Sequence, residues 1–164
     1  MLVVGSLPGE ASLAAQRYYA HPQNQFWHLA GHVIGDAALP DREYDDRLAA
    51  LLAAGIGLWD TVRSGKRTGS LDSALRSVEG NALADLAAGL PDLKAVGFNG
   101  ATSAKIGAPM LAATDLALLA LPSSSAAHAR MTRAEKAAEW AALSPFLARS
   151  GLQSPGQCPD SSRQ

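Results

Sequence analysis

The chain has 164 residues, 48% of them hydrophobic, and a net charge of −1. These values predict one domain with a substantial core, and they exclude global disorder and strong electrostatic binding of nucleic acid, so that any contact with DNA must be local. The single cysteine, Cys158, excludes a disulfide or a cysteine-based metal framework. The absence of a signal peptide and of an apolar run long enough to span a bilayer predicts a cytoplasmic protein with no membrane contact, and we expect no metal and no cofactor.

The first 27 residues hold most of the unusual features. Residues 2–4 are apolar and predict a short strand, which ends in a loop of small residues over 5–9. A helix is expected next, capped by Ser12 or a neighbour. Residues 18–27 then place two tyrosines, one phenylalanine and one tryptophan beside Asn, Gln and His. This crowding in an aromatic-poor chain favours a binding site, although Phe26 and Trp27 are better explained as packing a helix on the sheet.

Strand and helix patterns alternate along the rest of the chain. Helices are expected over 26–35, 41–54, 82–89 and 132–148, and extended segments over 55–62, 94–98 and 116–121. Thr132 and Glu135 form a capping box for the last helix, and the continuous apolar run 116–121 is typical of a strand buried on both faces. Residues 63–73 predict a polar, flexible loop whose Asp72 or Ser73 could cap a short helix after it.

This alternation predicts an α/β fold, a three-layer αβα sandwich around a short, mostly parallel sheet. We expect residues 1–148 to form one domain and residues 149–164, which are rich in Pro, Gly and Ser, to be a disordered tail. Ligands bind such sheets at the carboxyl ends of the strands. Three small, polar loops follow predicted strands there, over 5–9, 99–103 and 122–125. Short α/β domains need turns in any case, but three such loops with the aromatic run beside the first favour a nucleotide or nucleic-acid site.

Several motifs then resemble one known family, in order. The first is G-S-L-P-G over 5–9 followed by Y-Y-A-H-P-Q-N-Q-F-W over 18–27, and later come G-L-W-D over 57–60, G-S-L-D-S over 69–73, F-N-G over 98–100 and L-P-S-S-S over 121–125. Together they resemble the uracil-DNA glycosylase superfamily and, more narrowly, its hypoxanthine-DNA (deoxyinosine) glycosylase branch. The resemblance covers residues 1–147. It implies a DNA glycosylase whose substrate is DNA with a deaminated base and which releases hypoxanthine, with uracil as a second candidate. No lysine lies inside the motifs, so we expect a monofunctional enzyme without a lyase step, and we expect a monomer.

The chemistry of base release needs few titratable groups. Breaking the glycosidic bond creates a sugar cation and a leaving base with growing negative charge, so a positioned water and donors aimed at the base suffice once the base is flipped out of the stack. Mismatch-type relatives place an acidic or amide residue just before the proline of the first loop. Here Leu7 occupies that position, which disfavours ordinary uracil excision. The resemblance therefore implies Asn24 as the catalytic residue, with a cap for the turn after Pro22 as the alternative.

The resemblance also implies the binding residues. The flipped base would stack on Tyr19, and the base pocket would be formed by Ser6, Leu7, Gly9, Tyr19, His21 and Asn99. DNA contacts would come from Ser123, Ser124, Ser125, His128 and Arg130, with Arg133 close by. For each the structural alternative stays open: core packing for Tyr19, a local hydrogen bond for His21, helix capping for Asn99, and a solvated surface for the histidine and arginines. A loop of small hydroxyls fills an emptied stack poorly, so we expect weak product retention.

Three other functions remain open. A mismatch-specific uracil/thymine-DNA glycosylase would share the fold. An enzyme acting on free nucleotides or sugar phosphates could use the same three loops, although neither G-x-G-x-x-G nor a Walker lysine motif is present. A non-catalytic DNA-binding module would not need Asn24.

Overall fold

The sheet has four parallel strands in the order β2-β1-β5-β6. The computed structural model describes residues 1–66, 76–80 and 82–148, so the tail expected over 149–164 lies outside the described residues. The strands are β1 (Leu2–Gly5), β2 (Gly57–Asp60), β5 (Ala95–Asn99) and β6 (Ala117–Leu121). Since all four strands run in the same direction, their carboxyl ends meet at one edge of the sheet.

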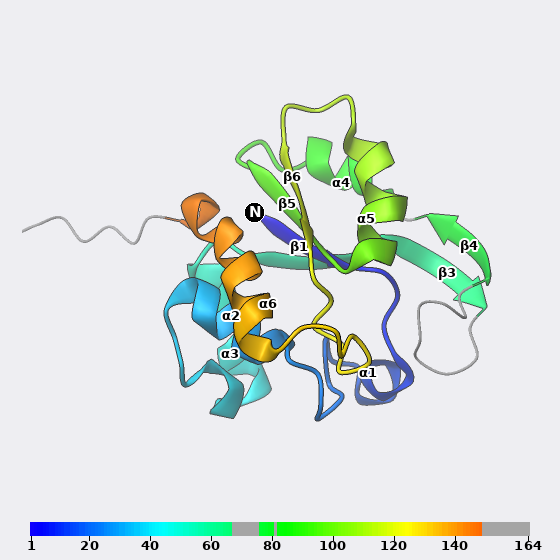
Figure 1. Ribbon diagram of the computed structural model, residues 1–164. Helices are drawn as coiled ribbons and strands as arrows, with labels where there is room; N and C mark the ends of the chain where they lie inside the picture. The colour runs from blue at the N-terminus through cyan, green and yellow to red at the C-terminus, as the bar shows by residue number, and fades with distance from the viewer. Residues whose placement is uncertain (67–75, 81, 149–164) are drawn as a thin grey trace, which may run out of the picture.

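Helices cover both faces of this sheet, as Figure 1 shows, and the predicted three-layer arrangement is confirmed. One layer contains α2 (Phe26–Ile34), α3 (Tyr44–Ala53) and α6 (Arg133–Trp140), and the other contains α4 (Leu83–Ala88) and α5 (Ala101–Gly107). Successive side chains of β1 alternate between the layers, because a strand directs them to opposite faces. Val3 packs among the first set of helices, whereas Leu2 and Val4 pack among the second.

Phe26 and Trp27 pack in the core, as the sequence indicated, at 0% and 4% exposure. The last helix begins with the predicted capping box of Thr132 and Glu135. It does not continue to residue 148 as an α-helix, because it changes to the 3-10 helix η4 (Ala141–Phe146), which contains Pro145. Proline lacks the N–H that an α-helix needs and its ring clashes with the carbonyl four residues earlier, which explains the change.

Two expectations about the strands are wrong. Residues 62–66 and 76–80, expected as part of a loop and as a short helix, instead form an antiparallel pair, β3 (Val62–Lys66) with β4 (Arg76–Gly80). Each strand provides the backbone hydrogen bonds that the other needs, and the local composition of residues 62–66 does not reveal that such a partner exists. The rest of the expected loop, with the motif over 69–73 and the cap expected at Asp72 or Ser73, lies outside the described residues. Second, β6 is not buried on both faces. It is an edge strand whose residues alternate in exposure, with Leu118 37% exposed.

The helix after the first loop, α1 (Glu10–Ala15), begins three residues earlier than a Ser12 cap would place it. Its N-cap is Gly9, and Ser12 lies inside the helix, where its hydroxyl accepts a hydrogen bond from the N–H of Ala20. Two short 3-10 helices complete the described elements, η1 (Leu39–Asp41) and η3 (Ala108–Leu111). No helix among the described residues is long and apolar enough to cross a membrane.

Candidate active site

A cleft of about 850 Å³ lies at the carboxyl edge of the sheet. Its walls come from four parts of the chain: the stretch from the end of β1 through α1 to residue 24, the end of β2, the β5–α5 turn, and residues 123–128 after β6. Figure 1 shows α1 and the segment after β6 meeting at this edge. The three loops that the sequence singled out therefore do line one cleft, together with a fourth strand end that it did not single out.

The floor of the cleft is fixed by hydrogen bonds to the end of β1. The carbonyl of Gly5 accepts the N–H of Thr61 at 2.8 Å and the Thr61 hydroxyl at 3.1 Å. The buried hydroxyl of Ser103 donates to the carbonyls of Val4 at 2.8 Å and Gly5 at 3.1 Å. The first loop therefore leaves the sheet from a rigid point, which a site needs if it is to place a substrate accurately.

Asn24 lines the cleft and also holds the turn that leads into α2, whose N-cap residue is Gln25. Its side-chain oxygen Oδ1 accepts the N–H of Phe26, the first residue of α2, at 2.9 Å. This is the structural role considered as the alternative to catalysis. It uses only part of the hydrogen-bonding capacity of the side chain. A carboxamide oxygen has a second lone pair, and Nδ2 has two hydrogens for which the described residues show no acceptor. The hydrogen bond from the Phe26 N–H holds the amide in one orientation and leaves it capable of binding a ligand.

Tyr19 connects the aromatic core to the cleft. Its ring stacks on Phe26 with 3.8 Å between centroids and 10° between planes, and Tyr19 also lines the cleft. The Tyr19 backbone has φ of +52°, in the left-handed region that side chains other than glycine rarely adopt. Such strain persists only where the surrounding structure enforces it and is common in functional sites.

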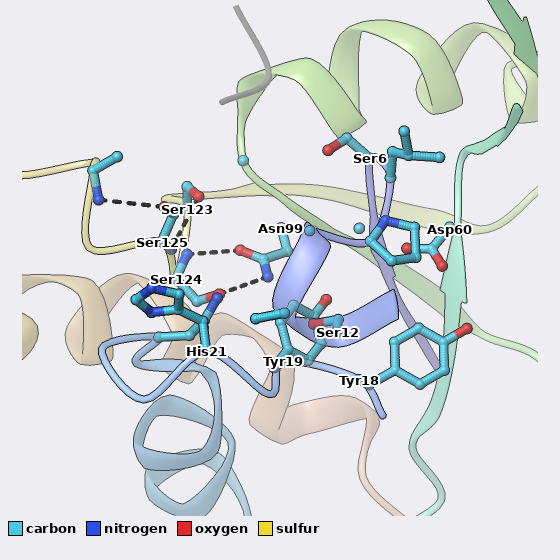
Figure 2. A pocket seen from close by; sticks show the side chains of 18 of the residues that line it. Ser6, Ser12, Tyr18, Tyr19, His21, Asp60, Asn99, Ser123, Ser124 and Ser125 are labelled. Carbon is cyan, nitrogen blue, oxygen red and sulfur yellow. Dashed lines mark hydrogen bonds between the residues drawn. The ribbon is translucent and has the colours of Figure 1, made fainter. Parts of the chain in front are cut away.

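Asn99 and Ser124 bind each other where the end of β5 meets the loop after β6. The Asn99 Nδ2 donates to the Ser124 hydroxyl at 2.8 Å, and the Ser124 N–H donates to Asn99 Oδ1 at 2.8 Å (Figure 2). Both side chains are buried. Asn99 therefore does not cap α5, whose N-cap residue is Gly100 without a side-chain cap bond. Its role here is to hold the loop after β6 against the end of β5.

Asp60 and Tyr18 lie at the other end of the cleft from the three serines in Figure 2. Burial raises the pKa of the Asp60 carboxyl to about 6, and a hydrogen bond from Tyr18 opposes that rise. Burial, together with the charge of Asp60, raises the pKa of Tyr18 to about 12, so the Tyr18 hydroxyl keeps its proton and donates a hydrogen bond to the Asp60 carboxylate. A methyl group added to Gly5 would lie 2.9 Å from Asp60 Oδ1, so only glycine leaves room for the carboxylate there.

The other sequence-predicted residues divide into two groups. Ser6, Leu7, Gly9, His21, Ser123, Ser125 and His128 all line the cleft, whereas Arg130 is exposed and does not. The Nδ1 atom of His21 accepts the N–H of Gln23 at 3.2 Å, the local hydrogen bond considered above. No group of three or more His, Cys, Asp and Glu side chains that could hold a metal ion occurs among the described residues.

Comparison with known proteins identifies the family. The sequence pattern described as "Uracil DNA glycosylase superfamily" matches residues 1–146. The chain belongs to this superfamily. It is 38% identical over 143 residues to a protein of Methanosarcina acetivorans named hypoxanthine DNA glycosylase, covering 87% of this chain and 89% of that one. It is 40% identical over 141 residues to the protein of the same name from Methanosarcina barkeri, covering 86% and 87%.

The superfamily fold is also shown by a solved structure. A protein of Methanosarcina acetivorans, determined in solution by NMR and described as a uracil DNA glycosylase, superimposes with a TM-score of 0.77. The two chains are 35% identical, with 88% of this chain and 89% of the other covered. The predicted fold class and the predicted superfamily are therefore both confirmed.

Asp60 is the site residue that the sequence interpretation missed. It was noted within the G-L-W-D motif, but the strand ends considered were those of β1, β5 and β6. A signal was available, since Asp60 ends an apolar, glycine-flanked strand of the same sheet. Tyr18 was likewise passed over in favour of Tyr19, although its hydroxyl is what reaches the carboxylate.

Proposed function

We propose that this member of the uracil DNA glycosylase superfamily hydrolyses the N-glycosidic bond of deaminated bases in DNA, with hypoxanthine as its main substrate, and leaves an abasic site. The observation that carries the proposal is the cleft itself: an aromatic platform, a carboxylate and a carboxamide converge on a space that a flipped base would occupy. The similarity to two proteins named hypoxanthine DNA glycosylase supports this choice of base. The proposal includes action as a cytoplasmic monomer.

In this proposal the base is selected by its hydrogen-bond pattern. Deamination of adenine replaces an amine by a carbonyl and turns the neighbouring ring nitrogen N1 from an acceptor into an N–H donor. An ionised carboxylate can accept hydrogen bonds but cannot donate them. The Asp60 carboxylate would therefore bind that N1–H and would repel the N1 lone pair of adenine. Guanine has the same N–H, but its pairing with cytosine makes it costlier to flip than a mismatched base. Uracil carries an equivalent N3–H and would be a weaker, smaller substrate.

The Tyr19 ring would hold the base while the bond breaks. With Phe26 supporting one of its faces, Tyr19 presents a rigid, flat surface to the cleft. Stacking of a base on an aromatic side chain is worth about 1–3 kcal/mol and tolerates different bases. Specificity would then come from the hydrogen bonds and not from the stack.

Asn24 would act on the sugar side. Its side-chain amide is held in place by the hydrogen bond from the Phe26 N–H to Oδ1. We infer that the free lone pair of Oδ1 positions the attacking water, while Nδ2 donates to the sugar or the departing base. A carboxamide takes up no proton, so Asn24 would orient the water without serving as a strong base; the developing charges would be stabilised by fixed dipoles. With Leu7 in the first loop, no carboxylate is available there.

The test is base release from synthetic duplexes. Each duplex carries one inosine, uracil or xanthine, and alkali cleaves the strand wherever a base has been lost. We expect cleavage at inosine, with slower cleavage at uracil, and none in the duplex with adenine at the same position. No cleavage of any deaminated duplex would refute the proposal.

Two further measurements separate the alternatives. A free-nucleotide enzyme would be thermally stabilised by inosine monophosphate, whereas we expect no shift in the melting temperature. A non-catalytic DNA-binding module would bind the inosine duplex and leave every base in place.

A further inference from the structure

The serine loop, residues 123–125, is held from behind by three donors. The carbonyl of Pro122, directly before it, accepts the Trp140 indole N–H at 2.9 Å. The Ser124 carbonyl accepts the backbone N–H of Gln25 at 2.9 Å. The Ser125 carbonyl accepts Nζ of Lys136 at 3.2 Å. These bonds draw carbonyl oxygens away from the surface where a phosphate would bind, which removes a source of repulsion.

Of the three donors only Lys136 is charged, and a charged donor costs more free energy to bury than a neutral one. Lys136 is 1% exposed, and burial lowers the pKa of its ammonium. No carboxylate pairs with it in the described parts of the chain. The acid next to it, Glu135, is bonded to the N–H and hydroxyl of Thr132 instead. A buried ammonium that lacks a counter-ion is destabilising, and a neutral donor would hold the carbonyl equally well.

The charge is explained if an anion completes the site. Lys136 lies on α6, in the layer that packs against the loop, and its bond to Ser125 lies at the partly buried edge of the fold. An ammonium covered by one layer of chain is screened less than a surface charge, so its field reaches a ligand on the other side of that layer. Ser123, Ser124 and Ser125 form the opposite side, which faces the cleft.

We propose that Lys136 is a positioning residue that places a positive charge on the side of the serine loop away from the cleft, so that the loop binds the DNA phosphate beside the flipped nucleotide. The inference rests on the proposed function, because it assumes that DNA lies across this cleft. Lys136 touches neither the base nor the sugar; it acts through Ser125 and through its field. It also answers how a chain of net charge −1 can attract a phosphate at this point.

The test measures DNA binding and stability separately. The probe is a duplex with one tetrahydrofuran abasic-site analogue, and Kd is measured by fluorescence anisotropy over a range of salt concentrations. Lys136→Gln keeps a donor and removes the charge. Lys136→Met removes both and keeps the apolar volume. Lys94→Gln is the matched control, since Lys94 is exposed and precedes the amino end of β5, away from the cleft.

We expect both Lys136 variants to bind the probe roughly tenfold more weakly at low salt, with the slope of log Kd against log salt reduced by about one. Lys94→Gln should keep the wild-type slope. The melting temperature of Lys136→Met should equal or exceed that of the wild type, because the uncompensated charge is gone.

A wild-type slope in both Lys136 variants would overturn the inference, and so would loss of folding in both, because the ammonium would then be structural. The proposed function is judged on its own by base release from the inosine duplex with the wild-type protein. Release with an unchanged slope in the variants would leave that function standing and refute only the role of Lys136. Absence of DNA binding by the wild type would refute both.

Discussion

Replacing Asp60 by asparagine should make the protein more stable and less active. Asparagine has nearly the same shape and keeps an oxygen that can accept the Tyr18 hydrogen bond. It removes the ionisation. Since burial raises the pKa of Asp60, the folded protein favours the protonated carboxyl, and the ionised form that the proposed function requires at neutral pH is unfavourable in the fold.

The size of the effect follows from the two pKa values. The pKa of Asp60 rises from 3.8 to about 6 on folding, a difference equivalent to about 3 kcal/mol. A raised pKa contributes stability in full below pH 3.8, and that contribution is lost as the pH rises through about 6. Asp60→Asn should therefore gain up to about 3 kcal/mol at pH 8 and almost nothing near pH 3. For a chain of this length the gain at pH 8 corresponds to a melting temperature higher by up to roughly 6–12 °C.

Activity should change in the opposite direction. A hydrogen bond to a charged group contributes about 1.5–3 kcal/mol, so kcat/KM on inosine duplexes should fall roughly 10- to 100-fold in Asp60→Asn. Wild-type kcat/KM should itself fall below about pH 6, close to tenfold per pH unit, because the carboxyl becomes protonated. The variant should lack this acidic limb and discriminate less well against adenine.

The assay combines thermal melts at pH 3.5 and pH 8 with single-turnover base release between pH 5 and pH 9. Asp92→Asn, at an exposed position, is the control for the loss of one carboxylate. If Asp60→Asn keeps the acidic limb, or melts below the wild type at pH 8, the assignment of Asp60 as an ionised, buried reader of the base is wrong.

Three further predictions concern the rest of the cleft. Asn24→Ala should lose base release by at least roughly 100-fold while binding the abasic analogue, and should lose about 1 kcal/mol of stability because the turn before α2 loses its hydrogen bond from the Phe26 N–H. Asn24→Asp keeps that hydrogen bond, so its stability should be retained while hypoxanthine release is still slowed, as melts and alkali cleavage will report. Tyr19→Phe should keep nearly wild-type kcat/KM, whereas Tyr19→Ala should lose roughly 10- to 100-fold, and equal losses in both would argue for the hydroxyl instead of the stack. Borohydride should trap no covalent adduct with abasic DNA, since the described residues lining the cleft include no lysine, and a trapped band on a denaturing gel would reveal a lyase step.

The sequence was informative where function rests on local patterns. The run over residues 18–27 indicated both the core role of Phe26 and the cleft position of Asn24, because a helix start and a polar loop are encoded by neighbouring residues. The layers followed from the alternation of apolar segments. Along β1, Val3 packs in one layer and Leu2 and Val4 pack in the other, as the alternation of side chains in a strand requires. The end of β2 was overlooked because its position beside β1 depends on strand order, which no local pattern specifies.

The same limit explains the errors in secondary structure. Whether residues 62–66 form a loop or a strand depends on a partner at 76–80, and whether 117–121 is central or at the edge depends on how many strands follow it. The partner of Lys136 was equally hidden. Its position four residues before Trp140 places it on the buried face of α6, but the Ser125 carbonyl that it binds belongs to another segment. Each case requires knowledge of contacts between residues distant in sequence.

Unfavourable features of this molecule concentrate around one cleft. The non-glycine residues with positive φ in the described chain, Gln16 and Tyr19, both line it. Asp60 ionises there with a raised pKa, and Lys136 lies buried behind its serine loop without a carboxylate partner in the described residues. A chain selected for stability alone would lose these features first, since each has a less costly replacement. In the proposed function these features act together: the strained Tyr19 would present the stacking surface, Asp60 would bind the base and Lys136 would attract the phosphate. Stabilising substitutions at Asp60 and Lys136 should therefore each reduce function.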